Sequence, residues 1–396
     1  MSNFSARRSF AVRFTFGQSA GAKLNWLVML SVFSIAVSVQ AQDRHFVTNS
    51  RQLLGIETRR SASVRAADID SDGDLDIVVA NGRHWPQQNM LFLNHERAIF
   101  SVARPMGIDL STSYACEFAD LDGDGDLDIA VGNDNAPCLI FTNDGAGHFQ
   151  RHSEFGTPSS VRSLTMADIN GDGHIDLLTT CRSRPNRIYF NDGKANFSDS
   201  TTFGTQKDST IDVAVADLND DGKNDLILAN RDAQPNSILL NMGDGQFAKP
   251  TFFGSSRVSS RAIATADFDG DGHTDWVVGN IRAANTVYFG DGSGSASREV
   301  RFGQADSQTY CIAAADLNKD GLPDLIVGNM RQPNAVFYNT NKGQQFTAQP
   351  FGPVDSATYG LCVGDFNGDG FADIAVANSD QQNHVYINQP ARKSSL

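Results

Sequence analysis

The sequence predicts an all-β fold made of seven repeated units, and three observations lead to that prediction. One segment of about 50 residues occurs seven times and fills the chain from residue 42 to residue 390. Each copy carries an acidic loop, and the runs on either side of the loop are rich in the β-branched and apolar residues typical of strands. A repeat of this length matches one four-stranded blade, so we expect a seven-bladed β-propeller.

The first 41 residues are set apart from the repeats because they have the composition of a signal peptide. An apolar run covers residues 24–39, and we expect cleavage before Gln42. A retained membrane anchor is the alternative, since the run is close to the shortest that spans a bilayer. No later segment is apolar enough to span, and residues 391–396 form a short C-terminal tail. The basic residues of the leader are Arg7, Arg8, Arg13 and Lys23.

The charge and the cysteines of the chain limit the kinds of partner and the cellular compartment that are possible for it. The formal net charge is −14, which disfavours nucleic acid as a partner because such binding relies on lysines and arginines that displace counterions. Export predicts a secreted, periplasmic or cell-surface protein. Five cysteines leave at least one unpaired within the monomer, and small buried thiols are the simplest interpretation.

Each unit contains signals for four strands. Residues 264–266 lead into an acidic loop and residues 275–279 leave it, while residues 186–190 are a third strand that ends in the turn Asn191-Asp192-Gly193. The fourth strand is expected near Phe149, Phe197, Phe247 and Phe346. An apolar residue and a glycine open every unit, for example Phe155-Gly156, and we expect the glycine to adopt an unusual backbone angle.

The two ends of the repeat region complement each other. The last unit stops after residues 385–388 without an outer strand. His45-Phe46 precedes Leu54-Gly55 much as His148-Phe149 precedes Phe155-Gly156. We therefore expect an N-terminal outer strand to complete blade seven and close the ring, which would leave no exposed sheet edge.

The acidic loops keep an oxygen-bearing side chain at alternate positions. Position 1 is aspartate in every copy, and position 3 is aspartate or asparagine. Position 5 is again aspartate, and glycine at position 6 lets the loop turn sharply. These three ligand positions comprise Asp68, Asp120, Asp168, Asp217, Asp267, Asp316 and Asp365; then Asp70, Asp122, Asn170, Asn219, Asp269, Asn318 and Asn367; then Asp72, Asp124, Asp172, Asp221, Asp271, Asp320 and Asp369.

Two further positions complete a ligand set for calcium. The residue at position 7 is expected to contribute its backbone carbonyl, and position 9 is aspartate throughout. Hard oxygen ligands at positions 1, 3, 5, 7 and 9 suit a six- or seven-coordinate Ca²⁺, so we expect up to seven structural calcium ions; acidic turns without metal are the alternative. These residues are Asp74, Asp126, His174, Lys223, His273, Leu322 and Phe371 at position 7, and Asp76, Asp128, Asp176, Asp225, Asp275, Asp324 and Asp373 at position 9.

The loop begins like an EF-hand, but strands replace the flanking helices and position 12 carries no acid. In this respect the repeats resemble the FG-GAP (VCBS) repeats of the integrin α-subunit propeller and of related bacterial and fungal proteins. The resemblance covers residues 45 to 388 and implies a β-propeller. It also points to a role in binding partners, although fold alone does not decide function.

The face opposite the acidic loops is the predicted ligand face. Six residues before the loops lie mostly large planar side chains, and arginines follow the second strand in several copies. Up to seven similar pockets would suit sugars or carboxylates. In the alternative, asparagines such as Asn133 cap turns and the arginines pair between blades. The candidate ligand residues are Tyr114, Arg162, Arg261, Tyr310, Tyr359, Arg83, Arg182, Arg231, Arg282 and Arg331.

Three classes of function remain open at this stage. The first is a non-catalytic binding or adhesion protein that recognises a glycan or an extracellular protein. The second is a polysaccharide lyase or hydrolase, although the sequence has no GxSxG or HExxH motif and no candidate catalytic residue. The third is a scaffold for another subunit, docked through the divergent third blade at Cys181, Arg182 and Arg184. The oligomeric state stays open.

Overall fold

The computed structural model describes residues 44–108 and 110–391, and these residues form strands and no helix. The predicted leader and most of the C-terminal tail lie outside this range. Within residues 44–108 and 110–391 there is accordingly no helix of the length and apolarity needed to cross a membrane. The all-β prediction is therefore confirmed.

Five antiparallel sheets have four strands each. The first sheet contains β6 (Ser113–Ala119), β7 (Asp128–Asn133), β8 (Cys138–Thr142) and β9 (Gln150–Phe155), and the second β10 (Val161–Ala167), β11 (Asp176–Cys181), β12 (Asn186–Phe190) and β13 (Asp199–Phe203). The third contains β14 (Thr210–Ala216), β15 (Asp225–Asn230), β16 (Asn236–Leu239) and β19 (Thr251–Phe253), with a hairpin of β17 (Asn241–Gly243) and β18 (Gln246–Phe247) beside it. The fourth contains β20 (Ser259–Ala266), β21 (Asp275–Ile281), β22 (Asn285–Gly290) and β23 (Ala296–Phe302), and the fifth β24 (Thr309–Ala315), β25 (Asp324–Asn329), β26 (Asn334–Thr340) and β27 (Gln345–Phe351).

The remaining seven strands are linked into one larger sheet. They are β1 (Arg44–Val47), β2 (Leu53–Ala67), β3 (Asp76–Asn81), β4 (Met90–Leu93), β5 (Val102–Pro105), β28 (Thr358–Gly364) and β29 (Asp373–Pro390). β29 is longer than the sequence indicates because Ser379 and Gln381, in the connection between two expected strands, pair with Arg60 and Arg59 of β2. The start of β2 and all of β1 pair antiparallel with the C-terminal half of β29.

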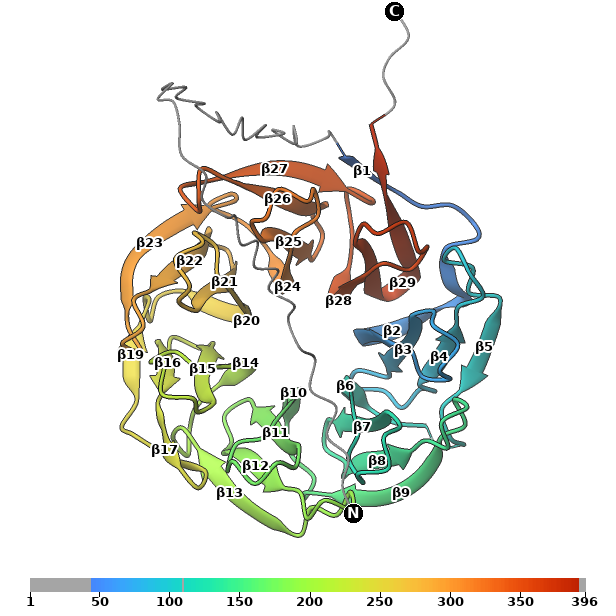
Figure 1. The fold of residues 1–396 in the computed structure, drawn as a ribbon, viewed down its shortest axis with the longest axis horizontal. Helices are drawn as coiled ribbons and strands as arrows, with labels where there is room; N and C mark the ends of the chain where they lie inside the picture. Colours follow the sequence, from blue (N-terminus) through green and yellow to red (C-terminus); the bar gives the residue numbers. More distant parts are fainter. Residues whose placement is uncertain (1–43, 109, 392–396) are drawn as a thin grey trace, which may run out of the picture. The chain divides into compact units, whose positions relative to one another are not determined.

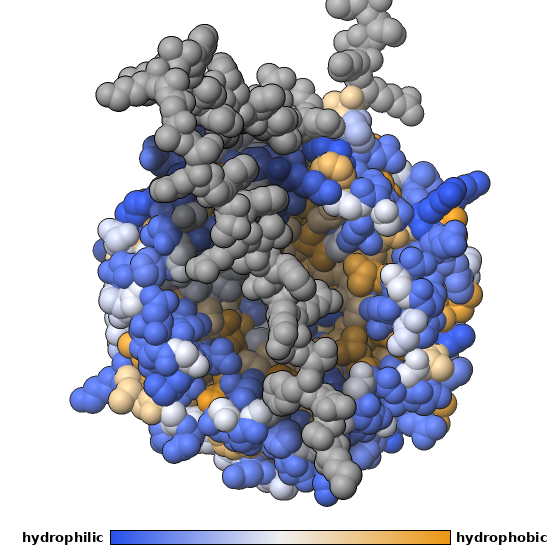
Figure 2. Space-filling view, in the orientation of Figure 1, coloured by the Kyte–Doolittle hydropathy of each residue, from blue (hydrophilic) through white to orange (hydrophobic). Residues whose placement is uncertain are grey.

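The sheets stand around a common axis with the first strand of each sheet innermost (Figure 1). Each innermost strand neighbours the next, in the order β2, β6, β10, β14, β20, β24 and β28, and β28 in turn neighbours β2. Figure 2 shows one face of the molecule, on which hydrophilic side chains dominate the rim and hydrophobic ones gather toward the centre. The innermost strands line a cavity on this axis.

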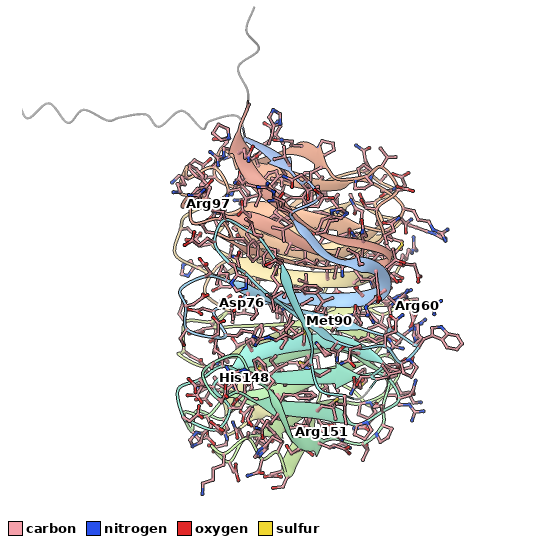
Figure 3. The ribbon with its side chains drawn as sticks, turned by 90° about the vertical axis from the view of Figure 1, so that its right-hand side faces the viewer. Arg60, Asp76, Met90, Arg97, His148 and Arg151 are labelled. Carbon is pink, nitrogen blue, oxygen red and sulfur yellow. The ribbon has the colours of Figure 1, made fainter. Side chains whose placement is uncertain are left out.

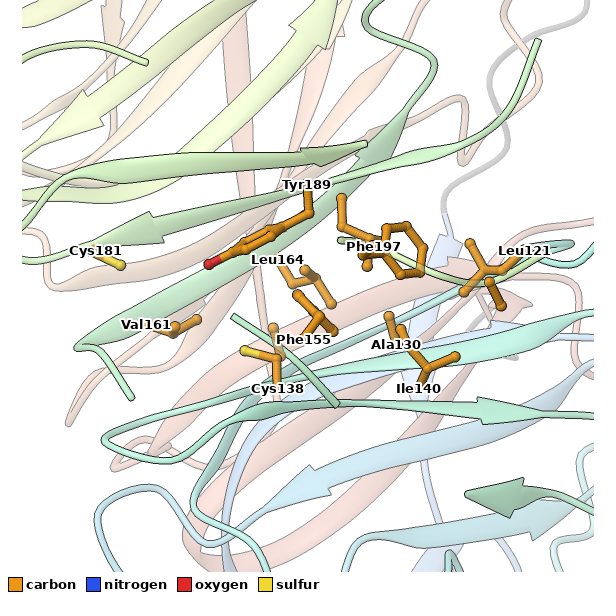
Figure 4. Close-up of a cluster of buried hydrophobic side chains, with 13 residues drawn as sticks. Leu121, Ala130, Cys138, Ile140, Phe155, Val161, Leu164, Cys181, Tyr189 and Phe197 are labelled. Atoms are coloured by element: carbon orange, nitrogen blue, oxygen red, sulfur yellow. The ribbon is translucent and has the colours of Figure 1, made fainter. Parts of the chain in front are cut away.

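The core is divided into layers that lie between neighbouring sheets. Figure 4 shows one such layer, in which Phe155 from one sheet meets Tyr189 from the next sheet and Phe197 from the connection between β12 and β13. The rings of Phe155 and Tyr189 have centroids 5.1 Å apart in an edge-to-face arrangement. Burying a side chain of this size stabilises the fold by about 1.5–3 kcal/mol, so each interface holds its sheets together through apolar packing.

The glycine that opens each unit has the unusual backbone angle that was predicted, and the structure shows it to be left-handed. Gly156, for example, has a φ of 71°, and a side chain there would meet the hydroxyl of Tyr189. The five cysteines are unpaired: three are buried and two partly so. They pack as small apolar side chains, as the sequence suggested.

Candidate functional site

The acidic loops connect the first and second strands of every sheet. The aspartate at position 9 begins the second strand and is fully buried in all seven copies. In the third sheet, the two carboxylate oxygens of Asp225 accept hydrogen bonds from the N–H groups of Leu218 (3.0 Å) and Asn241 (2.7 Å). The other six copies repeat both bonds with their own residues, so position 9 clamps the loop to the turn after the third strand.

Two further hydrogen bonds shape the loop from inside. The carboxylate at position 1 accepts a bond from the N–H of the glycine at position 6, and the carboxylate at position 5 accepts one from the N–H at position 7. Together with position 9, these bonds hold three carboxylates around one backbone turn. Figure 3 shows Asp76, with Arg97 and His148, on the opposite side of the molecule from Arg60.

Three loops bring acidic oxygens close enough to share a cation. Their ligand atoms lie within 4.8 Å of one another in the groups Asp68/Asp70/Asp76, Asp120/Asp122/Asp128 and Asp267/Asp269/Asp271. One oxygen each of Asp68, Asp70 and Asp269 is buried without a hydrogen-bond partner. Because an unpaired buried carboxylate oxygen is costly, the donor set fits a hard divalent cation such as Ca²⁺.

The loops with asparagine at position 3 differ in detail. In these four loops the amide nitrogen of the asparagine lies 2.8–3.3 Å from the aspartate at position 5. The amide then donates to the carboxylate, whereas a rotated amide would present its oxygen as a ligand. These loops therefore hold one less negative charge for a cation.

Burial also perturbs the position 9 carboxylates. Desolvation raises the pKa of Asp275, Asp324 and Asp373 to about 7, and the neighbouring acids of the same loop add to the rise. Backbone N–H donors act in the opposite direction. The metal-free loop thus holds its negative charge at a cost, and a bound cation would offset that cost.

An asparagine at the end of the third strand ties six of the seven loops to a neighbouring sheet. The side-chain amide of Asn339 donates to the carbonyl oxygen of Phe268 in the preceding sheet (2.7 Å). Asn94 makes the same bond to Phe366 (2.8 Å), which joins the first and last units. The sequence indicated only a turn at this position; its recurrence at the end of strand three was the available signal. The other members are Asn143, Asn191, Asn241 and Asn388, while Gly290 takes this place in the fourth sheet.

The planar residues predicted six positions before the loops occupy a structural feature that the sequence did not reveal. The pairing register of strands one and two shifts at this position in every sheet, so the residue is the extra member of a β-bulge. A bulge re-aims its side chain. We call these the bulge residues: Ala62, Tyr114, Arg162, Ile211, Arg261, Tyr310 and Tyr359.

All seven bulge residues line one cavity of about 610 Å³ on the axis, which we call the central cavity. The expectation of up to seven similar pockets is therefore wrong for these positions, because every bulge directs its side chain toward the same axis. Tyr310 and Tyr359 contact edge to face at 5.0 Å, and the guanidinium of Arg261 lies 4.1 Å from the Tyr310 ring centroid. Arg83 donates to the hydroxyl of Tyr359 (2.6 Å).

A second group at the same end is internally paired. The Tyr114 hydroxyl lies 2.7 Å from Nε2 of His84, and Nδ1 of His84 lies 2.9 Å from Asp134. Arg162 donates to the other oxygen of Asp134 (2.8 Å). This chain of contacts joins three neighbouring sheets and leaves Arg162 neutralised.

Other charged groups of the central cavity are also paired. Nε of Arg65 donates to both carboxylate oxygens of Glu117 at 2.8 Å. Asp212 accepts bonds from the N–H groups of Ile263 and Val213, and burial raises its pKa to about 6. Burial likewise raises the pKa of the Cys311 thiol to about 12, so this cysteine is an unreactive thiol.

The remaining predicted ligand residues are found in three different situations. Arg182 forms a two-pronged ion pair with Asp232 of the next sheet, as the alternative interpretation expected. Asn133 donates to the carbonyl of Pro137 and so caps a turn, again as that alternative expected. Arg231 and Arg282 line a separate depression of about 430 Å³, and Arg331 is exposed.

Comparison with known proteins identifies the repeat. Residues 120–179, 168–228, 217–278, 267–327 and 316–376 match the model of the FG-GAP-like repeat. Two crystal structures of BBS1N in complex with ARL6DN, soaked with mercury and with lead, are similar in fold: TM-scores are 0.59 and 0.60 and identities 13% and 12%, covering 89% of this chain and 98% of that chain. A search of curated proteins finds no match. The chain therefore belongs to the FG-GAP-like repeat family and is a β-propeller protein.

Proposed function

We propose that this chain is an exported, calcium-stabilised binding protein: a seven-bladed propeller, closed by its N-terminal outer strand, that recognises a partner through the face opposite the acidic loops. The observation that carries the proposal is the set of seven bulges, which deliver one side chain from every unit into a single cavity. Pairing of β1 with β29, and of Asn94 with Phe366, supports seven blades and closure.

The two ends of the innermost strands support a division of roles. At the loop end the ligand positions are almost invariant, which suits a structural metal. At the bulge end the side chains vary, which suits recognition of one partner. The similar propeller BBS1N is in complex with ARL6DN, and this favours a protein among the candidate partners.

An enzyme acting on polysaccharides has one observation in its favour. Two acids, Glu117 and Asp212, line the central cavity, and glycosidases use paired carboxylates. Glu117 is held by Arg65, however, and Asp212 by two backbone N–H groups. These contacts favour a structural role over proton transfer.

The test is a screen of the full, calcium-loaded chain against a glycan array and a peptide array. We expect binding that is lost in a Tyr310→Ala/Tyr359→Ala double variant and kept in Lys342→Ala, a turn variant. No binder on either array, or binders that are indifferent to the cavity variant, would overturn the proposal. Release of reducing sugar that stops in Glu117→Gln would replace it with the enzyme.

A further inference from the structure

Arg261 is a buried cation without an anionic partner. It is 9% exposed, it lines the central cavity, and its Nε has no hydrogen-bond partner. Its contacts are the faces of Tyr310 and Tyr359, at 4.1 and 5.2 Å from the ring centroids. Among the described residues no carboxylate pairs with it. Because a buried charge is tolerated poorly without a counter-charge, this arrangement favours an incoming anion.

A second positive charge near Arg261 makes its unpaired state more costly and so favours an anion further. Burial lowers the pKa of the Arg261 guanidinium, and the positive charge of Arg231 lowers it further. Arg231 lies in the separate depression, which it lines together with Arg257 and Arg282. No acid lines this depression, and Tyr310 lines both it and the central cavity. Tyr310 therefore stands between one buried arginine and three more accessible ones.

Three other arginines near this end provide a contrast. Arg65, Arg162 and Arg182 each face a carboxylate, that of Glu117, Asp134 and Asp232 respectively. The arginines around Tyr310 have no such partner among the described residues. In a chain with a net charge of −14, a cluster of unpaired arginines is a local feature and not a reflection of composition.

We infer that the arginines around Tyr310 (Arg231, Arg257, Arg261 and Arg282) form a binding site for carboxylates, supplied by an acidic segment of a protein partner. One acidic side chain would enter the central cavity and meet Arg261, and a second would lie in the depression. Guanidinium groups bind carboxylates in a two-pronged geometry that a lysine cannot reproduce. The inference rests on the proposed binding function and names the chemistry of its ligand.

A protein segment fits the surroundings better than an acidic glycan does. Exposed apolar side chains occur in the connections at this end of the units: Leu110 and Val354 precede first strands, and Trp85 follows a second strand. Ile56, also exposed, lies in the first part of β2. Aliphatic residues such as Leu110 and Val354 do not contribute to the recognition of a sugar acid. Apolar and arginine side chains on one face are typical of protein interfaces.

The experiment uses the full, calcium-loaded chain and an array of hexapeptides. Two aspartates or glutamates are placed at varied spacing among glycine and serine, and every member has a counterpart with asparagine or glutamine. We expect some acidic members to bind and their amide counterparts to bind at least tenfold more weakly. Arg261→Met should weaken the same members at least tenfold, and binding should fall as salt is raised.

Two variants control for folding. Arg301→Gln changes an exposed arginine on the outer strand of the same sheet and should leave binding unchanged. Arg282 is exposed, so the Arg282→Gln variant should fold normally, and we expect it to bind the acidic peptides severalfold more weakly. Arg261→Met should also melt no lower than the parent chain when no peptide is present, because an unpaired charge has been removed. A purely structural Arg261 would lower the melting temperature.

Each contrary outcome has a distinct meaning. Peptides that bind equally well with amides, or equally well to Arg261→Met, would overturn the carboxylate site while the cavity-dependent binding function stands. Arg261-dependent binding of oligogalacturonate, with none of the acidic peptides, would overturn the protein ligand in favour of an acidic glycan. Peptide and glycan arrays that are both blank would overturn the carboxylate site together with the proposed function.

Discussion

The two ends of the innermost strands differ in how strictly the repeat is kept. At the loop end, position 9 is a buried aspartate with the same two backbone partners in all seven copies. At the bulge end, the residues at equivalent positions range from alanine to arginine, yet the bulge itself is present each time. The comparison teaches that the backbone path is repeated at both ends, whereas side-chain chemistry is repeated only where it holds the fold.

The largest expected difference between the ends comes from calcium. Removing it with excess chelator should lower the free energy of unfolding by roughly 8 kcal/mol if only three sites are filled at about 100 times their Kd. Thermal unfolding with calcium and with chelator, beside a count of bound ions per chain, measures the effect. If the chain binds no calcium and its melting temperature is unchanged by chelator, the acidic loops are not calcium sites.

The second-largest expected loss of stability comes from replacing a single buried carboxylate. Asp225→Asn sets an amide N–H₂ against backbone donors in a fully buried site, and we expect a loss of about 3 kcal/mol or more in unfolding free energy. At the other end of the same sheet, Arg231→Gln should stay within about 0.5 kcal/mol. Urea unfolding of both variants measures the difference, and equal losses would contradict the contrast.

The asparagine that links neighbouring sheets should have an intermediate effect. Asn339→Ala removes the bond to Phe268 and leaves that carbonyl buried, so we expect a loss of about 1–3 kcal/mol. Gln344→Ala, in the exposed turn five residues later, is the control and should change little. If both variants unfold alike, the link between sheets carries no stability.

The smallest expected effect is a difference in calcium affinity between individual loops. Asn318→Asp adds a negative charge to a loop that has asparagine at position 3. Asp269→Asn removes a negative charge from a loop in which one carboxylate oxygen has no hydrogen-bond partner. We expect calcium affinity to rise in the first variant and to fall in the second, each by about tenfold at the altered site. Calorimetric titration of the full chain resolves the change, and unaltered binding curves would show that position 3 is not a ligand.

Local geometry was the most predictable part of the fold. A glycine such as Gly156 is required by a backbone angle that other residues rarely adopt, and the acidic loop follows from its spacing alone. The strand order within a sheet follows from short connections. Such features are encoded within a few consecutive residues, so one copy of the repeat is enough to predict them.

Features that join different units were harder to predict. The amide of Asn339 and the carbonyl of Phe268 are 71 residues apart, and nothing near either residue indicates the other. The bulge residues were singled out by position, but their meeting in one cavity depends on how the sheets stand around the axis. For the same reason the isolation of Arg261 from carboxylates could not be read from its neighbours in the chain.

The pairing of β1 with β29 constrains how the chain reaches its final structure. Arg44 donates from its side chain to Asn388, which lies 344 residues further along. That contact cannot form until residue 388 has been synthesised, so the pairing of β1 with β29 is among the last to form within residues 44–390. Contacts of such long range form slowly, and unpaired strand edges invite association in the meantime. A chain cut before β29 would keep both edges open, and we expect it to aggregate, however well its other sheets fold.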